Sequence, residues 1–169
     1  MEIPLMKQLY TSLVRPHLEF RNVVWNPYLK GEMDLLERVQ HRSTRMILGL
    51  AKLDYEERLE KMDLPSLTFR RAKGDAIETY KNLHGFYTID SSHMLPLHTT
   101  DGITTRGHSL KLQKRDCRTQ LRMNFFGLRT VSSWNQLPER IAQASTVNSF
   151  KGLYDRHYVE QRYKDRYQF

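Results

Sequence analysis

Zinc coordination is the first chemistry to consider, because three histidines and the single cysteine lie in one central stretch, at His93, His98, His108 and Cys117. Imidazole and thiolate groups are the usual protein ligands of zinc. However, four, nine and eight residues separate these side chains, and no two of them form the closely spaced ligand pair of a zinc finger. The sequence therefore predicts no metal site and no cofactor.

Other catalytic signatures are also missing from the sequence. It contains no glycine-rich phosphate loop and no serine or cysteine in a recognisable nucleophile motif. A two-metal polymerase or nuclease needs clustered carboxylates that hold two ions a few ångströms apart, and no Asp-Asp pair occurs. We therefore expect no enzymatic activity from this chain in isolation.

A run of cations after the middle of the chain points instead to binding. Between residues 106 and 129 only Asp116 carries a negative charge. Lys and Arg side chains that contact phosphates release condensed counterions, which provides most of the sequence-independent affinity for nucleic acid. The predicted nucleic-acid-binding residues are Arg106, Lys111, Lys114, Arg115, Arg118 and Arg122, and Arg129 continues the run. The alternative is an ordinary solvated surface.

Two further groups of cations have a structural explanation. Arg38, Arg42 and Arg45 are spaced to share one helix face, and Asp34 is placed to pair with Arg38, so a solvated, salt-bridged face is favoured over a nucleic-acid contact. The tail at 154–169 alternates aromatic and cationic residues, which could stack on bases. We favour core packing of Tyr154 and Tyr158 followed by a frayed end.

Composition limits the class of protein. The 169 residues carry a net charge of +8, and residues 101–169 hold 13 Lys and Arg against 6 Asp and Glu. This asymmetry favours polyanionic partners. No stretch approaches the roughly 20 apolar residues that cross a bilayer. No N-terminal run combines a basic start with a long apolar stretch, and the single cysteine cannot form an internal disulfide, so nothing in the sequence indicates secretion. We expect no membrane partner and a location inside the cell, in the nucleus or cytoplasm.

Hydrophobic periodicity predicts a mainly α fold that would position these cations. A helical N-terminal lobe at 1–90 should contain about four helices. The first, at 4–20, should be kinked or restarted by Pro16, and the second should run from near Glu32 to near Gly49. The third should run from Asp54, which forms a capping arrangement with Glu57, to Met62. The fourth should be capped by Ser66 and end at Gly85, a left-handed terminator. We expect a linker at 91–108 and a basic C-terminal part at 109–169, with two helices, the last of them capped by Thr146, and a short β-hairpin. The apolar positions that we expect to face the core are Leu5, Leu9 and Leu13 with Met6 and Tyr10, then Leu36, Val39, Met46 and Leu50; the hairpin would pair Leu110 and Leu112 with Leu121 and Met123.

Five blocks of sequence resemble one known family. In order they are LYTSLVRPHLEF, VVWNPYLKGEMDLLERVQHRSTRMILGL, YEERLEKMDLPSLTFRRAKGDAIETYKNLHG, TTRGHSLKL and NFFGLRTVSSWNQLPERIAQASTVNSFKGLYD. Together they resemble the segment downstream of the catalytic palm in reverse transcriptases of non-LTR, LINE-type, jockey-like retrotransposons. The matching positions are Trp25, Arg58, Arg71, Asp75, Tyr80, Arg106, Gly107, Trp134, Pro138 and Phe150.

This resemblance implies a non-catalytic fragment of an RNA-directed DNA polymerase that holds RNA or DNA beside the polymerase. The polymerase and endonuclease carboxylates of the family lie upstream of the matching segment, so none is carried over to this chain. The partners implied are RNA or DNA, bound largely without sequence preference, and an upstream polymerase domain. Two alternatives remain: a protein-interaction module that docks to a polymerase domain or another partner, and a relic fragment of a mobile element without selected function.

Overall fold

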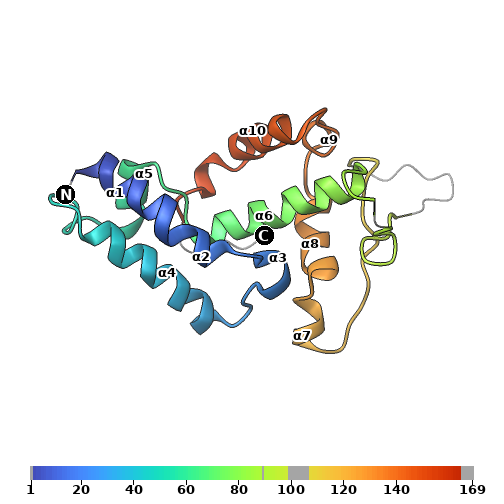
Figure 1. Cartoon of the computed structure of the whole chain (residues 1–169). Coiled ribbons are helices and arrows are strands. Elements are labelled where there is room, and N and C mark those ends of the chain that lie inside the picture. The colour runs from blue at the N-terminus through green and yellow to red at the C-terminus, as the bar shows by residue number, and fades with distance from the viewer. Residues whose placement is uncertain (1, 89, 99–106, 165–169) are drawn as a thin grey trace. The chain divides into compact units, whose positions relative to one another are not determined.

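The computed structural model describes residues 2–88, 90–98 and 107–164, which are mainly helical (Figure 1). The prediction of a mainly α fold is therefore confirmed. Contacts group the described residues into two compact units, and the division falls inside one long helix, after Ala72. Unit 1 contains residues 2–72 and 158–164, and unit 2 contains residues 73–157. This grouping differs from the predicted division into 1–90, 91–108 and 109–169.

Unit 1 begins with a continuous helical stretch that changes from α-helix to π-helix and back to α-helix. It consists of α1 (Ile3–Leu9), the π-helical η1 (Tyr10–Val14) and α2 (Arg15–Glu19). Pro16 lies at the start of α2, and because proline has no amide N–H it removes one bond from the regular ladder. The predicted effect of Pro16 on the helix at 4–20 is thus seen as a change of helix type just before it.

Three more predicted boundaries agree closely with the helices of unit 1. After the short α3 (Asn22–Trp25), the chain turns at Pro27 and enters α4 (Lys30–Arg45). Asp54 and Glu57 form the expected capping box at the start of α5 (Tyr55–Met62). Ser66 accepts a hydrogen bond from the Phe69 amide at 3.2 Å and so caps α6 (Leu67–Leu83).

The core of unit 1 contains three of the predicted side chains, Met6, Tyr10 and Leu50, together with others that were not predicted. Its buried cluster consists of Met6, Tyr10, Ile47, Leu50, Tyr55, Leu59, Met62 and Leu64. Leu5, Leu9 and Leu13 lie on the exposed side of the first helical stretch, and Val39 of α4 and Met46, directly after α4, are also exposed. The prediction that these five residues face the core is wrong, because the neighbouring positions of each helix occupy the inner side.

The C-terminal residues of unit 1 return to the connection between α5 and α6. After η2 (Val159–Gln161), the carbonyl of Arg162 accepts a hydrogen bond from the Ser66 amide at 3.0 Å. The Tyr163 hydroxyl donates to Asp63 at 2.9 Å, and Arg162 pairs with the same carboxylate at 3.0 Å. These contacts hold residues 162 and 163 against unit 1, whereas residues 165–169 of the tail lie outside the described residues.

Unit 2 is built around the second half of α6 and three following helical segments: α8 (Phe126–Asn135), the short α9 (Glu139–Ala142) and α10 (Val147–His157). Thr146 caps α10 as predicted, by accepting from the Ser149 amide at 3.1 Å. Tyr80 of α6 stacks on Phe150 of α10 with ring centroids 4.6 Å apart, and Phe150 stacks on Trp134 of α8 at 6.1 Å. This aromatic column joins the three longest helical segments of unit 2.

The predicted β-hairpin is wrong. Residues 120–123 form the short helix α7 (Gln120–Met123), because the Thr119 hydroxyl caps it by accepting from the Arg122 amide at 3.3 Å. Leu112 instead forms an isolated antiparallel bridge with Leu97. No strand longer than this bridge occurs in residues 2–88, 90–98 and 107–164.

Candidate nucleic-acid interface

Five of the six predicted binding residues lie on a segment of unit 2 that is fixed firmly at one end. We call residues 111–122 the cationic segment. At its start the Lys111 carbonyl accepts from the His98 amide, and the Gln113 amide donates to the Pro96 carbonyl, both at 2.8 Å. The Asn135 side chain donates to the Leu112 carbonyl and accepts from the Leu112 amide, also at 2.8 Å in each case. The first residues of the segment are therefore attached to α8.

The other end of the cationic segment is attached through α7. Asn124 follows α7 and donates from its side chain to the Gln120 carbonyl at 2.8 Å. The Arg122 guanidinium lies over the Phe125 ring, 5.3 Å from its centroid, and Phe126 is buried at the start of α8. Between these two anchors, residues 113–117 have no regular secondary structure.

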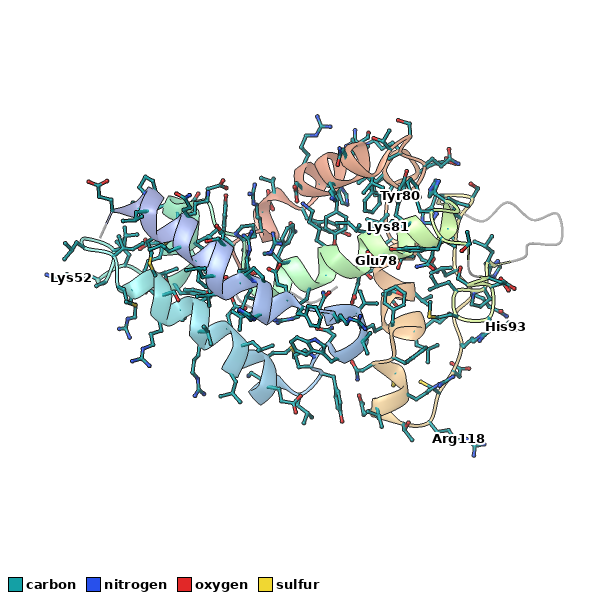
Figure 2. The ribbon with its side chains drawn as sticks, in the orientation of Figure 1. Lys52, Glu78, Tyr80, Lys81, His93 and Arg118 are labelled. Carbon is teal, nitrogen blue, oxygen red and sulfur yellow. The ribbon has the colours of Figure 1, made fainter. Side chains whose placement is uncertain are left out.

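Four of the six predicted residues are exposed on this segment. Lys114, Arg115, Arg118 and Arg122 are all exposed, and in the described part of the chain none of them forms an ion pair with a carboxylate. Arg115 donates one hydrogen bond, to the His93 carbonyl at 3.2 Å. Figure 2 shows Arg118 extending away from the ribbon. These cations are available to an anionic ligand without first breaking an ion pair.

The other two predicted residues are in different situations. Lys111 is half-buried, and its side chain lies so close to Gly107 that a Cβ on that glycine would be 2.6 Å from the Lys111 Cε atom. Arg106 lies outside the described residues. The structure thus brings four of the predicted cations onto one exposed stretch: Lys114, Arg115, Arg118 and Arg122. Lys111 lies at the start of this stretch and is half-buried.

Arg129, which continues the cationic run in the sequence, has a structural role. Its Nε and Nη2 atoms donate to the two carboxylate oxygens of Asp75 at 2.8 and 2.9 Å, and Nη1 donates to the Asn124 carbonyl at 2.9 Å. Only 11% of the Arg129 side chain and 10% of the Asp75 side chain are exposed. This bidentate pair joins α8 to α6 within unit 2, so Arg129 is not part of the exposed cationic surface.

The candidate zinc ligands do not converge. His108 is buried, with its ring edge-on to Trp134, and its Nε2 atom lies 2.9 Å from the Trp134 carbonyl. Burial lowers the pKa of His108, so the neutral ring that donates to this carbonyl is the favoured form. Within the ranges that the structure describes, no three His, Cys, Asp or Glu side chains are grouped to hold a metal ion.

Most residues that carry the family resemblance lie in the two cores. Arg58 is buried in unit 1, where it donates to the Thr44 hydroxyl and the Leu53 carbonyl at 3.2 and 2.8 Å. Tyr80 and Phe150 stack in unit 2, where the Trp134 indole also donates to the Leu110 carbonyl at 2.7 Å. Most of the matching positions that the structure describes are therefore buried, whereas most of the candidate binding cations lie between the blocks of sequence that carry the resemblance.

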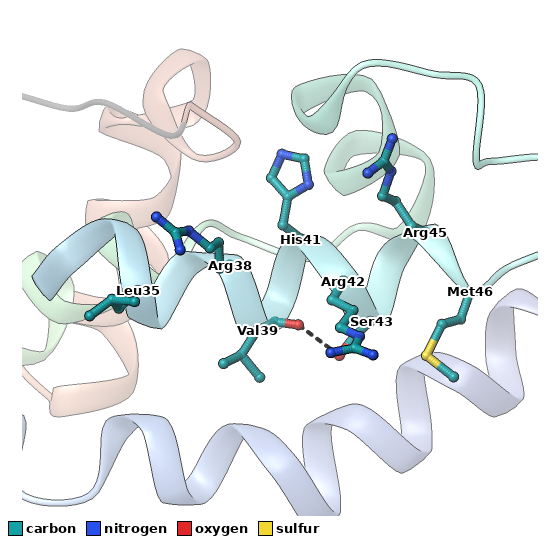
Figure 3. Close-up of a pocket in the computed structure, with 8 residues that line it drawn as sticks. All are labelled: Leu35, Arg38, Val39, His41, Arg42, Ser43, Arg45 and Met46. Carbon is teal, nitrogen blue, oxygen red and sulfur yellow. Dashed lines mark hydrogen bonds between the residues drawn. The ribbon is translucent and has the colours of Figure 1, made fainter. Parts of the chain in front are cut away.

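A second polar surface, on α4 of unit 1, was expected to be salt-bridged. Among the described residues no ion pair joins Asp34 to Arg38, and Arg38, Arg42 and Arg45 have no carboxylate partner. Instead they line an open groove of about 670 Å³ together with apolar side chains (Figure 3). Sequence periodicity missed this groove because it assumed that the apolar positions of α4 face the core.

No helix in the described ranges combines the length and the apolar character needed to cross a membrane. Comparison of the chain with protein-family models, curated proteins and solved structures gives no match. The function must therefore be argued from the chain's own side chains.

Proposed function

We propose that this chain is a non-catalytic binding segment that contacts the sugar-phosphate backbone of RNA or DNA through the cationic segment. The observation that carries this proposal is the exposure of Lys114, Arg115, Arg118 and Arg122 without carboxylate partners in the described part of the chain. Lys111 lies at the base of the segment.

Irregular backbone suits this type of contact. Phosphates lie along a nucleic-acid strand at nearly regular intervals, and cations spread along an exposed segment can each reach one of them. Phosphate contacts carry no sequence information, so binding should be largely independent of sequence. The Arg122 guanidinium over the Phe125 ring also offers a flat surface beside which a base could stack.

The resemblance to the segment downstream of the palm in LINE-type reverse transcriptases supports the same proposal. In such a context the chain would hold template, primer or target strand close to a polymerase domain that supplies the catalytic carboxylates. We propose no catalytic role for the isolated chain. A metal-dependent primer-extension assay should give no product above the buffer control, and incorporation that is lost on adding a chelator would contradict this.

The test is a salt titration of the full chain with a fluorescently labelled single-stranded RNA, followed by anisotropy. If the four exposed cations each neutralise one phosphate, the slope of log K against log[salt] should be about −3 for a single strand, since each contact contributes about 0.7. Affinity should then fall about 50-fold between 50 and 200 mM salt. Salt-insensitive binding, or no binding at low salt, would refute the proposal.

Charge reversal locates the surface. Arg115→Glu with Arg118→Glu should abolish binding at 150 mM salt and should halve the slope where residual binding is measurable. Arg140→Glu with Lys151→Glu is the matched control, because both residues are exposed in unit 2 and the net-charge change is the same. Equal losses for the two pairs would mean that only net charge matters and would contradict a localised site.

A second candidate function is protein interaction, and a specific observation favours it. Unit 1 exposes several large apolar side chains on or next to its helical segments: Leu5, Leu9, Leu13, Leu35, Val39 and Met46. Exposed apolar surface of this kind is typical of interaction sites. Because these side chains lie in unit 1 and the cationic segment lies in unit 2, both functions can exist in one chain.

A further inference from the structure

The long helix α4 of unit 1 turns polar side chains inward and apolar side chains outward. Its buried residues are Glu37, Gln40 and Thr44. On the opposite side Leu35, Val39 and Met46 are 57%, 38% and 60% exposed. A helix on the surface of a globular unit normally buries its apolar stripe and exposes its polar one.

Hydrogen bonds fix α4 in this orientation. One oxygen of the Glu37 carboxylate accepts from the Tyr55 hydroxyl at 2.6 Å and from the Leu67 amide at 3.1 Å. Burial, followed by the charge of Glu37, raises the pKa of the Tyr55 hydroxyl, so it remains a donor. These bonds tie the inner face of α4 to the two helices that follow it in unit 1.

Gln40 and Thr44 are held in the same way. The Gln40 side chain accepts from the Tyr10 hydroxyl at 2.7 Å and donates to the Pro65 carbonyl at 3.0 Å. Thr44 accepts from buried Arg58 at 3.2 Å. Rotating α4 to bury Leu35 and Met46 would break all of these bonds and leave buried polar groups unpaired, which is costly. The apolar stripe of α4 is therefore outward in the folded unit.

The outward face combines apolar and cationic side chains in one groove. Figure 3 shows Leu35, Val39 and Met46 along one side of α4, with the Arg42 side chain directed to the same side. Arg38 and Arg45 also line this groove, and the described residues provide no carboxylate partner for any of the three arginines. Leu35 and Met46 are about 17 Å apart along the helix axis, at 1.5 Å per residue.

We propose that this α4 groove binds an acidic amphipathic helix of a partner protein. Leucine-like side chains of that helix would cover Leu35, Val39 and Met46, and carboxylates flanking them would pair with Arg38, Arg42 and Arg45. A partner helix of about three turns matches the length of the apolar stripe. The proposal rests on the second candidate function and specifies the chemistry of its partner.

Charge distinguishes this occupant from two others. A second copy of the chain packed α4 against α4 about a twofold axis would bring Arg42 and its flanking arginines against the same residues, and like charges facing each other oppose association. A nucleic-acid backbone would satisfy the arginines, but it would leave Leu35, Val39 and Met46 against charged phosphates. An acidic amphipathic helix satisfies both kinds of side chain.

The test uses the full chain and a labelled synthetic 18-residue helical peptide with leucines on one face and glutamates beside them. The comparison peptide has lysine in place of each glutamate. The acidic peptide should bind the chain. The basic peptide should bind at least about tenfold more weakly, because its lysines would face arginines of the same charge. Equal affinity of the two peptides would overturn the proposal.

Two variants locate the peptide. Leu35→Gln with Val39→Gln and Met46→Gln should weaken acidic-peptide binding by more than about tenfold, because the peptide's leucines lose their apolar contacts. The matched control substitutes the exposed apolar residues Val24, Leu29 and Leu48 with Gln. Arg38→Glu with Arg42→Glu should also weaken binding, whereas Lys30→Glu with Lys52→Glu, also exposed in unit 1, should not. Circular dichroism should confirm that the helical content of every variant is unchanged.

Measurements of RNA binding and of sedimentation test the two other possible occupants of the α4 groove, a nucleic acid and a second copy of the chain. In the expected case, Arg38→Glu with Arg42→Glu leaves the RNA affinity of the chain unchanged, and the chain sediments as a monomer. A loss of RNA affinity equal to that of Arg115→Glu with Arg118→Glu would make α4 a nucleic-acid surface and overturn the proposal. A dimer that dissociates on substitution of Leu35, Val39 and Met46 would assign the groove to a second copy. Failure of RNA binding in the parent chain would refute only the nucleic-acid function.

Discussion

Substitution of the ion pair between Asp75 and Arg129 measures how much this pair contributes to the stability of unit 2. Both side chains are almost fully buried, and two parallel hydrogen bonds of 2.8 and 2.9 Å join them. We consider three variants: Asp75→Leu, Arg129→Met and the double variant. Each single substitution removes one partner of this buried bidentate pair.

The expected magnitudes follow from burial. Removing one partner of a buried ion pair costs about 3–5 kcal/mol, whereas replacing both by apolar residues is often nearly neutral. Because about a tenth of each side chain is exposed, we expect each single variant to lose about 3 kcal/mol, at the lower end of that range. The double variant should lose less than either single variant, which is a coupling of several kcal/mol.

Urea unfolding followed by tryptophan fluorescence can report on unit 2 alone. The chain has two tryptophans: Trp134 is buried in unit 2, and Trp25 is partly exposed in unit 1. In a Trp25→Phe variant, all of the tryptophan fluorescence comes from Trp134, so the signal follows the unfolding of unit 2. A loss of about 3 kcal/mol should lower the urea midpoint by about 2 M for a slope of about 1.5 kcal/mol per molar.

Lys73→Met is the internal control, because Lys73 of α6 also forms an ion pair, with Asp155 of α10 at 2.6 Å. That pair is more exposed, so its loss should cost about 1 kcal/mol or less. Single variants of Asp75 and Arg129 that each cost less than the Lys73 control would refute the reasoning. Losses that simply add in the double variant would refute it as well.

Two other predictions concern unit 2. His108 has a pKa lowered by burial from its ordinary value of 6.5, so below about pH 6.5 the unfolded chain binds a proton that the folded chain does not. The urea midpoint reported by Trp134 should therefore fall as the pH drops from 7 to 5, and this fall should be smaller in His108→Gln; an identical pH dependence in the variant would contradict it. Gly127→Ala should destabilise unit 2 because a Cβ there meets the Met94 backbone carbonyl, whereas Gly152→Ala, in open space on α10, should stabilise it by about 0.5–1 kcal/mol. Thermal unfolding measures both glycine variants, and a shift of the same sign in the two would contradict the packing argument.

Local signals in the sequence predicted most helix boundaries of this protein. The capping box of Asp54 and Glu57 and the caps at Ser66 and Thr146 form as expected. Each depends on a side chain and an amide two or three residues away, so the information is local. Gly85 has a positive φ of 70° after α6, which is the left-handed terminator expected there. The hairpin failed because the same kind of local cap, at Thr119, started a helix instead.

The candidate site was only partly predictable. The sequence gives the density of cations after residue 106, but it does not show which of them have a partner. Arg129 and Lys114 differ little in sequence context, yet Arg129 meets Asp75, 54 residues away, and Lys114 is exposed. Pairing over such a separation depends on how helices pack, and no local pattern encodes it.

The sequence alone determined the helical character of this protein, the positions of its caps and the excess of positive charge in its second half, because composition, periodicity and neighbouring residues are sufficient for these. Only the tertiary structure decided which face of α4 turns inward. Periodicity placed Val39 and Met46 in the core, but the hydrogen bonds of Glu37, Gln40 and Thr44 to residues from Tyr10 to Leu67 hold the polar face inside. A buried polar group needs a partner of matching geometry, and distant parts of the chain supply that partner only once they have folded together.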